Sequence, residues 1–359
     1  MSWVPAVLVL GGLIFVHEMG HFLAARACGV EVEEFSLGFG PKLAGFRRGG
    51  TLYALRLIPV LGYVRMAGMY PAEADGTADG ERSRAANARG VGFASQPLAQ
   101  RVLMIAAGPL VNFVIAFLLY AIVLGGVGLP VSPTLRIRAV DHGMPAAAAG
   151  IHPGDTVVAI NQATVGTWED LHQAIRAAAG TSGDKAMQVT LRRGSTERTV
   201  LVKPEHTASG PLIGIVPIVR TSRLPPLQAI LRGAVATFAS VYQNLAGLVG
   251  LIAAALAHQN SQAQLMGPIG IGSAIDQANQ AGTAALMLLA AILSANLGIL
   301  NLLPIPALDG GRLAFLGVEW LRGGRPIDPT KEGLVHFIGL AVLMAFIVLV
   351  SMHDITQLG

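Results

Sequence analysis

Four long stretches of this chain contain no Lys, Arg, Asp or Glu, apart from a single glutamate within the first. They cover residues 1–17 with a continuation at 19–25, 102–128, 284–308 and 333–350. A helix of about 20 apolar residues crosses a bilayer. Only 13% of the residues are charged, against about 25% in soluble domains. The sequence therefore predicts a polytopic α-helical membrane protein with about four transmembrane helices.

The distribution of basic residues predicts the topology. No Lys or Arg precedes Arg26 or follows Lys331, so the loops 26–101 and 309–332 are expected to be cytoplasmic and both termini extracytoplasmic. A cleaved signal peptide is not expected, because it would need basic residues before its apolar core. The net charge of +4 reflects these loops, and nucleic-acid binding is not expected.

Residues 227–257 complicate this topology, because they are apolar enough to be considered a fifth span, which would invert the two helices that follow. Arg232, Gln243 and Asn244 interrupt the run. We expect an amphipathic or interfacial helix that lies at the outer membrane surface or packs on the bundle.

Residues 133–205 have a different character, with short alternating apolar runs that are typical of strands. The run A-A-G-I-H-P-G-D, which ends at Asp155, resembles a PDZ domain of the permuted bacterial type. That resemblance implies an extracytoplasmic α+β domain that binds extended peptide at a sheet edge; a small α+β domain without a ligand is the alternative. The expected order is an N-terminal membrane part at 1–128, the PDZ-like domain at 133–205, a linker at 206–283 and a C-terminal membrane part at 284–359.

The first apolar stretch contains the sequence HEMGH. An ionisable side chain at the bilayer centre costs roughly 2.5–3.5 kcal/mol on insertion scales, so three of them require compensation. On a helix His17 and His21 project from one face, and Glu18 lies about 100° round the axis. Two histidines, a further ligand and a glutamate base form the arrangement of zinc hydrolases.

Residues 301–311, with the sequence NLLPIPALDGG, supply a candidate for the third ligand. Asp309 follows the third span at its cytoplasmic end, so it meets the first cluster if the first and third spans are parallel, as the topology predicts. Pro304 and Pro306 interrupt a regular helix, which at membrane depth is tolerated where the backbone lines a cavity. The two glycines after Asp309 are expected to allow close approach of the backbone to a metal.

Together the two motifs resemble the site-2 protease family of intramembrane zinc metalloproteases. The similarity is to the bacterial subgroup with periplasmic PDZ modules that regulates anti-sigma-factor cleavage. It extends over essentially the whole chain and includes IPVLGYVRMAG at 58–68, GPLVNF at 108–113 and MGPIGI at 266–271.

This resemblance implies roles for individual residues. His17, His21 and Asp309 match the ligands of one zinc ion, and Glu18 matches the catalytic base. Asn301 matches a position that holds the substrate backbone or stabilises the oxyanion, with interhelical hydrogen bonding as the alternative.

Residues 51–66 alternate and turn like a hairpin, and the equivalent stretch of the family forms β-structure that dips into the membrane beside the zinc. An added strand there would hold the substrate extended, which makes Tyr63 and Val64 candidate substrate-binding residues. The sequence departs from the family in having Leu61-Gly62 where Gly-Gly is usual. It also has one clear PDZ-like module, where many relatives from Gram-negative bacteria have two.

The sequence therefore predicts an intramembrane zinc endopeptidase of the bacterial inner membrane. Its expected substrates are single-span membrane proteins, such as anti-sigma factors or signal-peptide remnants, with membrane lipid and a peptide ligand of the PDZ-like domain as further partners. The alternatives are a non-catalytic scaffold or receptor with a structural metal, and a metal transporter. A fourth protein ligand that closed the zinc site would favour the scaffold. No unassigned Cys or His is expected near either motif, because His336 and His353 lie in or beyond the last helix.

Overall fold

The structure is a computed structural model that describes residues 3–69, 78–179, 186–207, 210–257 and 267–358. It divides into two compact units. The membrane unit comprises Met1–Gly126 and Pro225–Gly359, and the inserted unit comprises Val127–Leu224.

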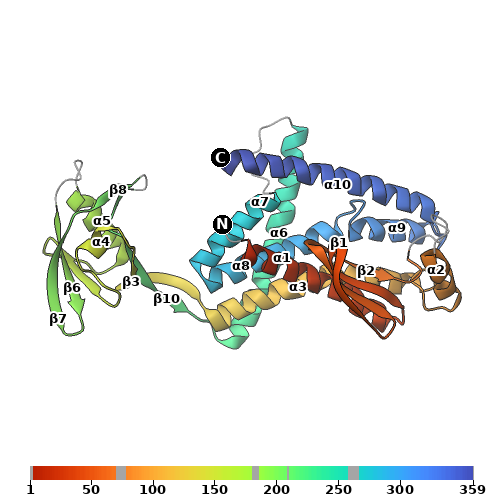
Figure 1. Ribbon diagram of the computed structural model, residues 1–359, viewed down its shortest axis with the longest axis horizontal. Helices are drawn as coiled ribbons and strands as arrows, with labels where there is room; N and C mark the ends of the chain where they lie inside the picture. Colours follow the sequence, from red (N-terminus) through yellow and green to blue (C-terminus); the bar gives the residue numbers. More distant parts are fainter. Residues whose placement is uncertain (1–2, 70–77, 180–185, 208–209, 258–266, 359) are drawn as a thin grey trace. The chain divides into compact units, whose positions relative to one another are not determined.

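Within the described residues, four helices of the chain are long and apolar enough to span a membrane, as the sequence predicts. They are α1 (Val4–Ala27), α3 (Leu98–Ile122, continued by a π-helical turn, Val123–Val127), α8 (Thr283–Leu302) and α10 (Pro329–Leu358) (Figure 1). Helix α3 packs against both α1 and α8. The most apolar window of α10 has no buried residue, so its apolar side chains suit a lipid environment. The chain is a multi-pass membrane protein.

The membrane unit contains further helices, namely α2 (Ala78–Ala88), α6 (Pro226–Leu256), α7 (Pro268–Ala281) and α9 (Asp309–Leu321). Helix α6 packs against α3 and α8. A Cβ atom at Gly233 would lie 3.0 Å from the backbone nitrogen of Ala121, so a glycine is what allows this close approach. Of the two placements expected for residues 227–257, the structure shows the one packed on the bundle.

Strands β1 (Val32–Arg48) and β2 (Thr51–Met66) form a hairpin. Its turn is at Gly49 and Gly50, whose φ angles of 58° and 85° suit a type I′ turn. The two ends of residues 51–66 therefore pair with β1 and not with each other. The stretch still reverses its direction as the sequence predicts, because residues 52–55 run parallel to residues 34–37 of β1 and residues 62–65 run antiparallel to them.

Both strands of this hairpin are bent. One segment of β1 therefore has strand partners on both of its sides. Residues 34–37 of β1 pair with residues 62–65 of β2 on one side and with residues 52–55 on the other. Residues 62–66 have β1 as their strand partner on one side and, among the described strands, none on the other. They form an edge of this small sheet.

The inserted unit is built on a sheet with the strand order β10-β3-β4-β6-β7 and with β5 beside β4. The strands are β3 (Leu129–Val140), β4 (Thr156–Ile160), β5 (Ala163–Thr164), β6 (Met187–Arg193), β7 (Thr196–Val202) and β10 (Ile215–Ser222), with helices α4 (Pro145–Ala148) and α5 (Trp168–Ala179) and a small pair β8 (Glu205–Thr207) and β9 (Gly210–Leu212). The unit extends beyond residues 133–205 because β3 pairs with β10, a strand within the segment expected to be a linker.

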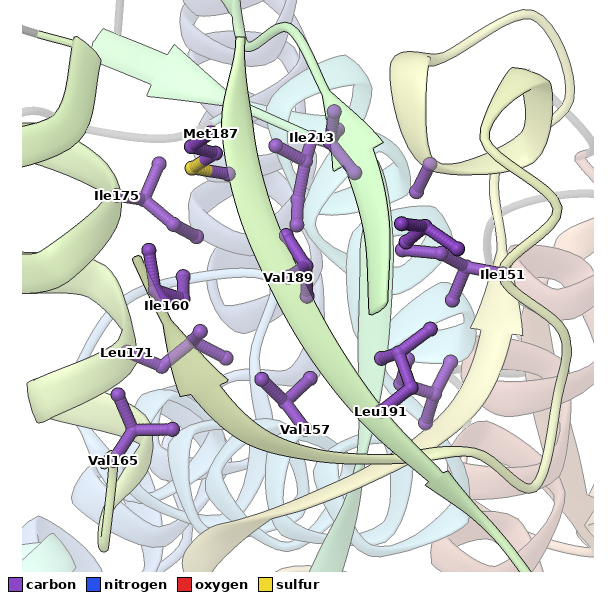
Figure 2. Packing of buried hydrophobic residues seen from close by; sticks show 14 residues of the cluster. Ile151, Val157, Ile160, Val165, Leu171, Ile175, Met187, Val189, Leu191 and Ile213 are labelled. Atoms are coloured by element: carbon purple, nitrogen blue, oxygen red, sulfur yellow. The ribbon is translucent and has the colours of Figure 1, made fainter. Parts of the chain in front are cut away.

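The core of the inserted unit lies between this sheet and its helices. Figure 2 shows Val157 of β4, Val189 of β6 and Leu171 of α5 meeting there, and each is at most 1% exposed. Apolar residues on alternate positions of β6 point into this core, as the pattern of its buried positions shows. This burial is what defines the inserted unit as a domain with its own core.

An ion pair between buried Asp155 and exposed Arg193 closes the loop before β4. Asp155 is 1% exposed and accepts hydrogen bonds from Arg193 Nε at 2.7 Å and from the backbone N–H of His152 at 2.9 Å. The hydrogen bond from the Arg193 guanidinium holds the pKa of the Asp155 carboxyl below its usual value.

Candidate metal centre

Three side-chain donor atoms meet in the membrane unit. His17 Nε2 and His21 Nε2 of α1 lie 3.2 Å apart. Asp309 Oδ2, from the first residue of α9, lies 3.1 Å from the first nitrogen and 3.2 Å from the second. Both histidines are buried, at 6% exposure. Two imidazoles and a carboxylate are a ligand set that zinc commonly binds in catalytic sites.

The spacing of these atoms fits a single metal ion. Zinc binds such ligands at about 2.0–2.2 Å, so two ligand atoms of a tetrahedral ion are separated by about 3.3 Å. All three observed separations are close to this value. Three protein ligands leave a fourth position free for a water molecule or a substrate, as in catalytic zinc sites.

The second nitrogen of His21 fixes its tautomer. Nδ1 lies 2.8 Å from the carbonyl oxygen of Met104 on α3. A carbonyl oxygen only accepts hydrogen bonds, so Nδ1 carries the proton. The lone pair of Nε2 then points at the other two candidate ligand atoms, His17 Nε2 and Asp309 Oδ2. A Cβ atom at Gly108 would lie 2.2 Å from His21 Nε2. The glycine of the GPLVNF run is therefore what makes room for this imidazole.

Asn112, from the same run, contacts the other histidine. Its side-chain amide lies 3.0 Å from His17 Nδ1, and the residue is fully buried. Its Oδ1 has no hydrogen-bond partner among the described residues. The two ends of an amide have the same shape, and a rotated amide would place Oδ1 where it accepts the His17 Nδ1 proton. Asn112 on α3 thus contacts a candidate metal ligand on α1.

Glu18 lies between the donor cluster and the edge of the small sheet. Its carboxylate accepts a hydrogen bond from the backbone N–H of Val64. A Cβ atom at Gly62 would lie 2.9 Å from Glu18 Cγ. Of the two glycines usual before Tyr-Val in the family, this chain keeps the one that packs against the glutamate.

The loop between α8 and α9 delivers Asp309 to the cluster. A Cβ atom at Gly310 would lie 2.0 Å from the carbonyl oxygen of Leu303, and one at Gly311 would lie 2.5 Å from that of Ile305. The sequence does not predict this role of the two glycines. They pack on the carbonyl groups of the loop that precedes the ligand.

His336 of α10 reaches the same loop. Its Nδ1 accepts a hydrogen bond from the backbone N–H of Ala307 at 2.9 Å. The expectation that no unassigned histidine lies near either motif is wrong, because α10 packs on the loop that carries Asp309. Periodicity in the sequence does not predict such a contact between a helix and a distant loop.

The donor atoms open into a cavity of about 400 Å³. The candidate substrate-binding residues Tyr63, Val64 and Asn301 line it, together with Glu18 and the three donors. Asn301 Nδ2 donates to the carbonyl of Leu297 at 3.0 Å, which lies on the same helix, so the interhelical alternative for this side chain is not observed. The Tyr63 hydroxyl donates to Glu34 at 2.8 Å, which ties the edge strand to β1.

Comparison with known proteins places the chain in a family. A model of peptidase family M50 matches residues 5–346. The zinc metalloprotease RasP of Geobacillus kaustophilus is 34% identical, over 99% of this chain and 98% of the relative. A putative zinc metalloprotease of Agrobacterium fabrum is 33% identical over 99% and 96%. The regulator of sigma-W protease RasP of Bacillus subtilis is 32% identical over 98% and 97%. The chain belongs to peptidase family M50, the site-2 proteases.

The protein is therefore a zinc metalloprotease of the site-2 type, and the scaffold and transporter alternatives are set aside. Among solved structures, the PDZ domain of an SdrC-like protein from Listeria monocytogenes is 18% identical and covers 24% of this chain and 90% of its own, with a TM-score of 0.21.

Proposed function

We propose that this protease hydrolyses peptide bonds within the transmembrane segment of single-span membrane proteins, such as anti-sigma factors or signal-peptide remnants. The observation that carries the proposal is one cavity in which two histidines and an aspartate that could hold a metal ion, a glutamate and an open strand edge lie together. A relative named as a regulator of sigma-W protease matches 98% of the chain and supports an anti-sigma factor as the substrate class.

His17, His21 and Asp309 would hold one zinc ion. When bound, zinc supplies a Lewis acid that activates water and polarises the scissile carbonyl. Glu18 takes the proton from the attacking water and passes it to the leaving amine nitrogen as the C–N bond breaks. The Val64 N–H fixes the orientation of the glutamate for both transfers. Met104 and Asn112 orient the two imidazoles from α3.

The edge strand at residues 62–66 would hold the substrate. A substrate helix hides its peptide bonds in its own hydrogen bonds, so it must be extended before attack, and strand addition stabilises that form. In an antiparallel pair, both backbone groups of one residue point to the same side. The N–H of Val64 points to Glu18, so the open side of the strand faces the glutamate. Asn301 lines the cavity, and the second N–H of its amide would bind a substrate carbonyl.

The charge distribution supports a location in the bacterial inner membrane, with both termini extracytoplasmic and the active site near the cytoplasmic side. The inserted unit is then extracytoplasmic, and its PDZ-like sequence run supports binding of an extended peptide.

The test uses the full-length chain and Glu18→Gln in bacterial membranes, with single-span substrates tagged at both ends. The wild-type chain should cut within the membrane segment, and Glu18→Gln should lower the rate by at least about a hundredfold. Glu31→Gln is the matched control, because Glu31 is exposed and paired with Arg89. Equal cleavage by Glu18→Gln and wild type, or cleavage only outside the membrane segment, would contradict the proposal.

A further inference from the structure

The loop that carries Asp309 has an unfavourable backbone conformation. Ala307 has a φ of 78°, in the left-handed region that residues with a Cβ atom rarely adopt. It lies between Pro306 and Leu308, two positions before the carboxylate of the metal triad. A conformation of this kind persists where the surroundings hold it.

The hydrogen bonds of the loop identify what holds it. Pro304 and Pro306 have no N–H group. The N–H of Ile305 donates to Leu303 and that of Leu308 donates to Ile305, so both bonds stay within the loop. The N–H of Ala307 donates instead to His336 Nδ1 on α10, at 2.9 Å. Among the backbone N–H groups of residues 304–308, that of Ala307 is the one bonded to another helix.

Helix α10 also packs on the loop one turn further along. A Cβ atom at Gly339 would lie 2.4 Å from Pro306 Cβ. His336 and Gly339 are three positions apart and share one face of α10. The His336 ring also lies 5.5 Å from the ring of Phe315 on α9, centroid to centroid. The histidine therefore contacts the segments on both sides of Asp309.

We propose that His336 is a positioning residue of the metal centre: by accepting the Ala307 N–H it holds the loop in the conformation that brings Asp309 Oδ2 to His17 and His21. The inference rests on the proposed role of Asp309 as a zinc ligand. The accepting Nδ1 has a lone pair and the ring proton is on Nε2. His336 itself neither binds the metal nor touches the substrate.

The test replaces His336 in the full-length protein, purified in detergent. In Asn the side-chain oxygen is as many bonds from Cβ as His Nδ1, and in Gln it is one bond further. His336→Leu and His336→Gln should weaken zinc affinity by roughly ten- to hundredfold, the usual cost of losing an outer partner of a ligand. His336→Asn should stay within about threefold of wild type, because it keeps an acceptor. Phe337→Leu, at the neighbouring and exposed position of α10, should have no effect.

Zinc affinity is measured by competition with a fluorescent chelator, and kcat and KM are measured at saturating zinc. His336→Leu and His336→Gln should lower kcat and leave KM unchanged, because the histidine positions a metal ligand and not the substrate. Wild-type zinc affinity in His336→Leu would overturn the proposal. So would equal losses in His336→Asn and His336→Leu, since that result assigns the effect to helix packing.

Asp309→Ala separates this proposal from the proposed function. If Asp309→Ala keeps its zinc, the ligand assignment itself fails, and the role of His336 fails with it. If Asp309→Ala loses zinc while His336→Leu does not, only the role of His336 fails. If His336 acts through Asp309, His336→Leu has no further effect on zinc affinity in the Asp309→Ala background.

Discussion

The two units of the protein differ in the polar side chains that they bury. In the inserted unit, Leu171 and Val189 are fully buried. In the membrane unit, the polar residues Asn112 and Ser294 are fully buried, while Phe337 is 70% exposed. Lipid is as apolar as a side chain, so helices in a membrane gain little by burying leucine and associate through close packing and polar contacts. The interior of the membrane unit can therefore hold polar side chains, including those of a metal centre.

Small residues provide that close packing between helices. A Cβ atom at Gly20 of α1 would lie 2.6 Å from the carbonyl oxygen of Ala107 on α3, and one at Gly298 of α8 would lie 2.9 Å from the Phe113 ring. If this comparison holds, substitutions inside the membrane unit act on the metal centre, and substitutions inside the other unit act on its folding.

The largest effect is expected from Gly108→Ala. The new methyl group would lie 2.2 Å from His21 Nε2 and would displace the imidazole. A shift of about 1 Å in a reacting group costs about a hundredfold in rate, so cleavage should fall by at least that factor. Gly12→Ala on α1 is the matched control, because nothing lies within 4 Å of its new methyl group. Zinc content and cleavage of a tagged substrate are the measurements, and an active Gly108→Ala would contradict the geometry of the centre.

The next effect is expected from Leu171→Ala in the inserted unit. Truncation of a fully buried leucine should destabilise that unit by about 2–5 kcal/mol. Hydrogen exchange in the full-length protein should show faster exchange at β4 and β6, with zinc affinity unchanged. Leu201→Ala, at a 65% exposed position of β7, should change stability by no more than about 0.5 kcal/mol. A loss of zinc in Leu171→Ala would break the comparison.

The smallest effect is expected from the ion pair of Asp155 and depends on pH. Because Arg193 lowers the pKa of the folded Asp155, the pair stabilises the unit fully above the unfolded pKa of about 4. That contribution is lost as the pH falls through the lower folded pKa. Asp155→Asn lacks the contribution at every pH. Its deficit against wild type should thus be constant near neutral pH and shrink below about pH 4, and a deficit that grows in acid would contradict the assignment.

The metal cluster is predictable from the sequence, because it follows from the spacing of residues along one helix and from the membrane topology. Helical geometry places His17 and His21 on one face, and charge counting makes the first and third spans parallel, which brings Asp309 to the same end. Both inferences use rules that act along one helix or along the membrane normal. The structure places the three donor atoms within 3.2 Å of each other.

The remainder depends on contacts that no local rule reports. The partner of residues 51–66 is a strand that begins at Val32, and its pairing on two sides follows from bends in both strands. His336 meets Ala307 only because α10 packs on the loop. The glycines after Asp309 are required by the carbonyl groups of that loop. In each case the residue type is evident from the sequence, whereas the tertiary contact is not predictable from it.

The pairing of the first and last strands of the inserted unit has a consequence for how such proteins diversify. Leu129 of β3 pairs with Ser222 of β10, so the chain enters and leaves this unit at neighbouring positions. A module attached in this way can be deleted, exchanged or duplicated without changing the separation that its two connections must span. The number of such modules can then vary among proteases that keep the same catalytic bundle, and replacement of residues 129–222 by a short linker is a direct way to obtain the bundle alone.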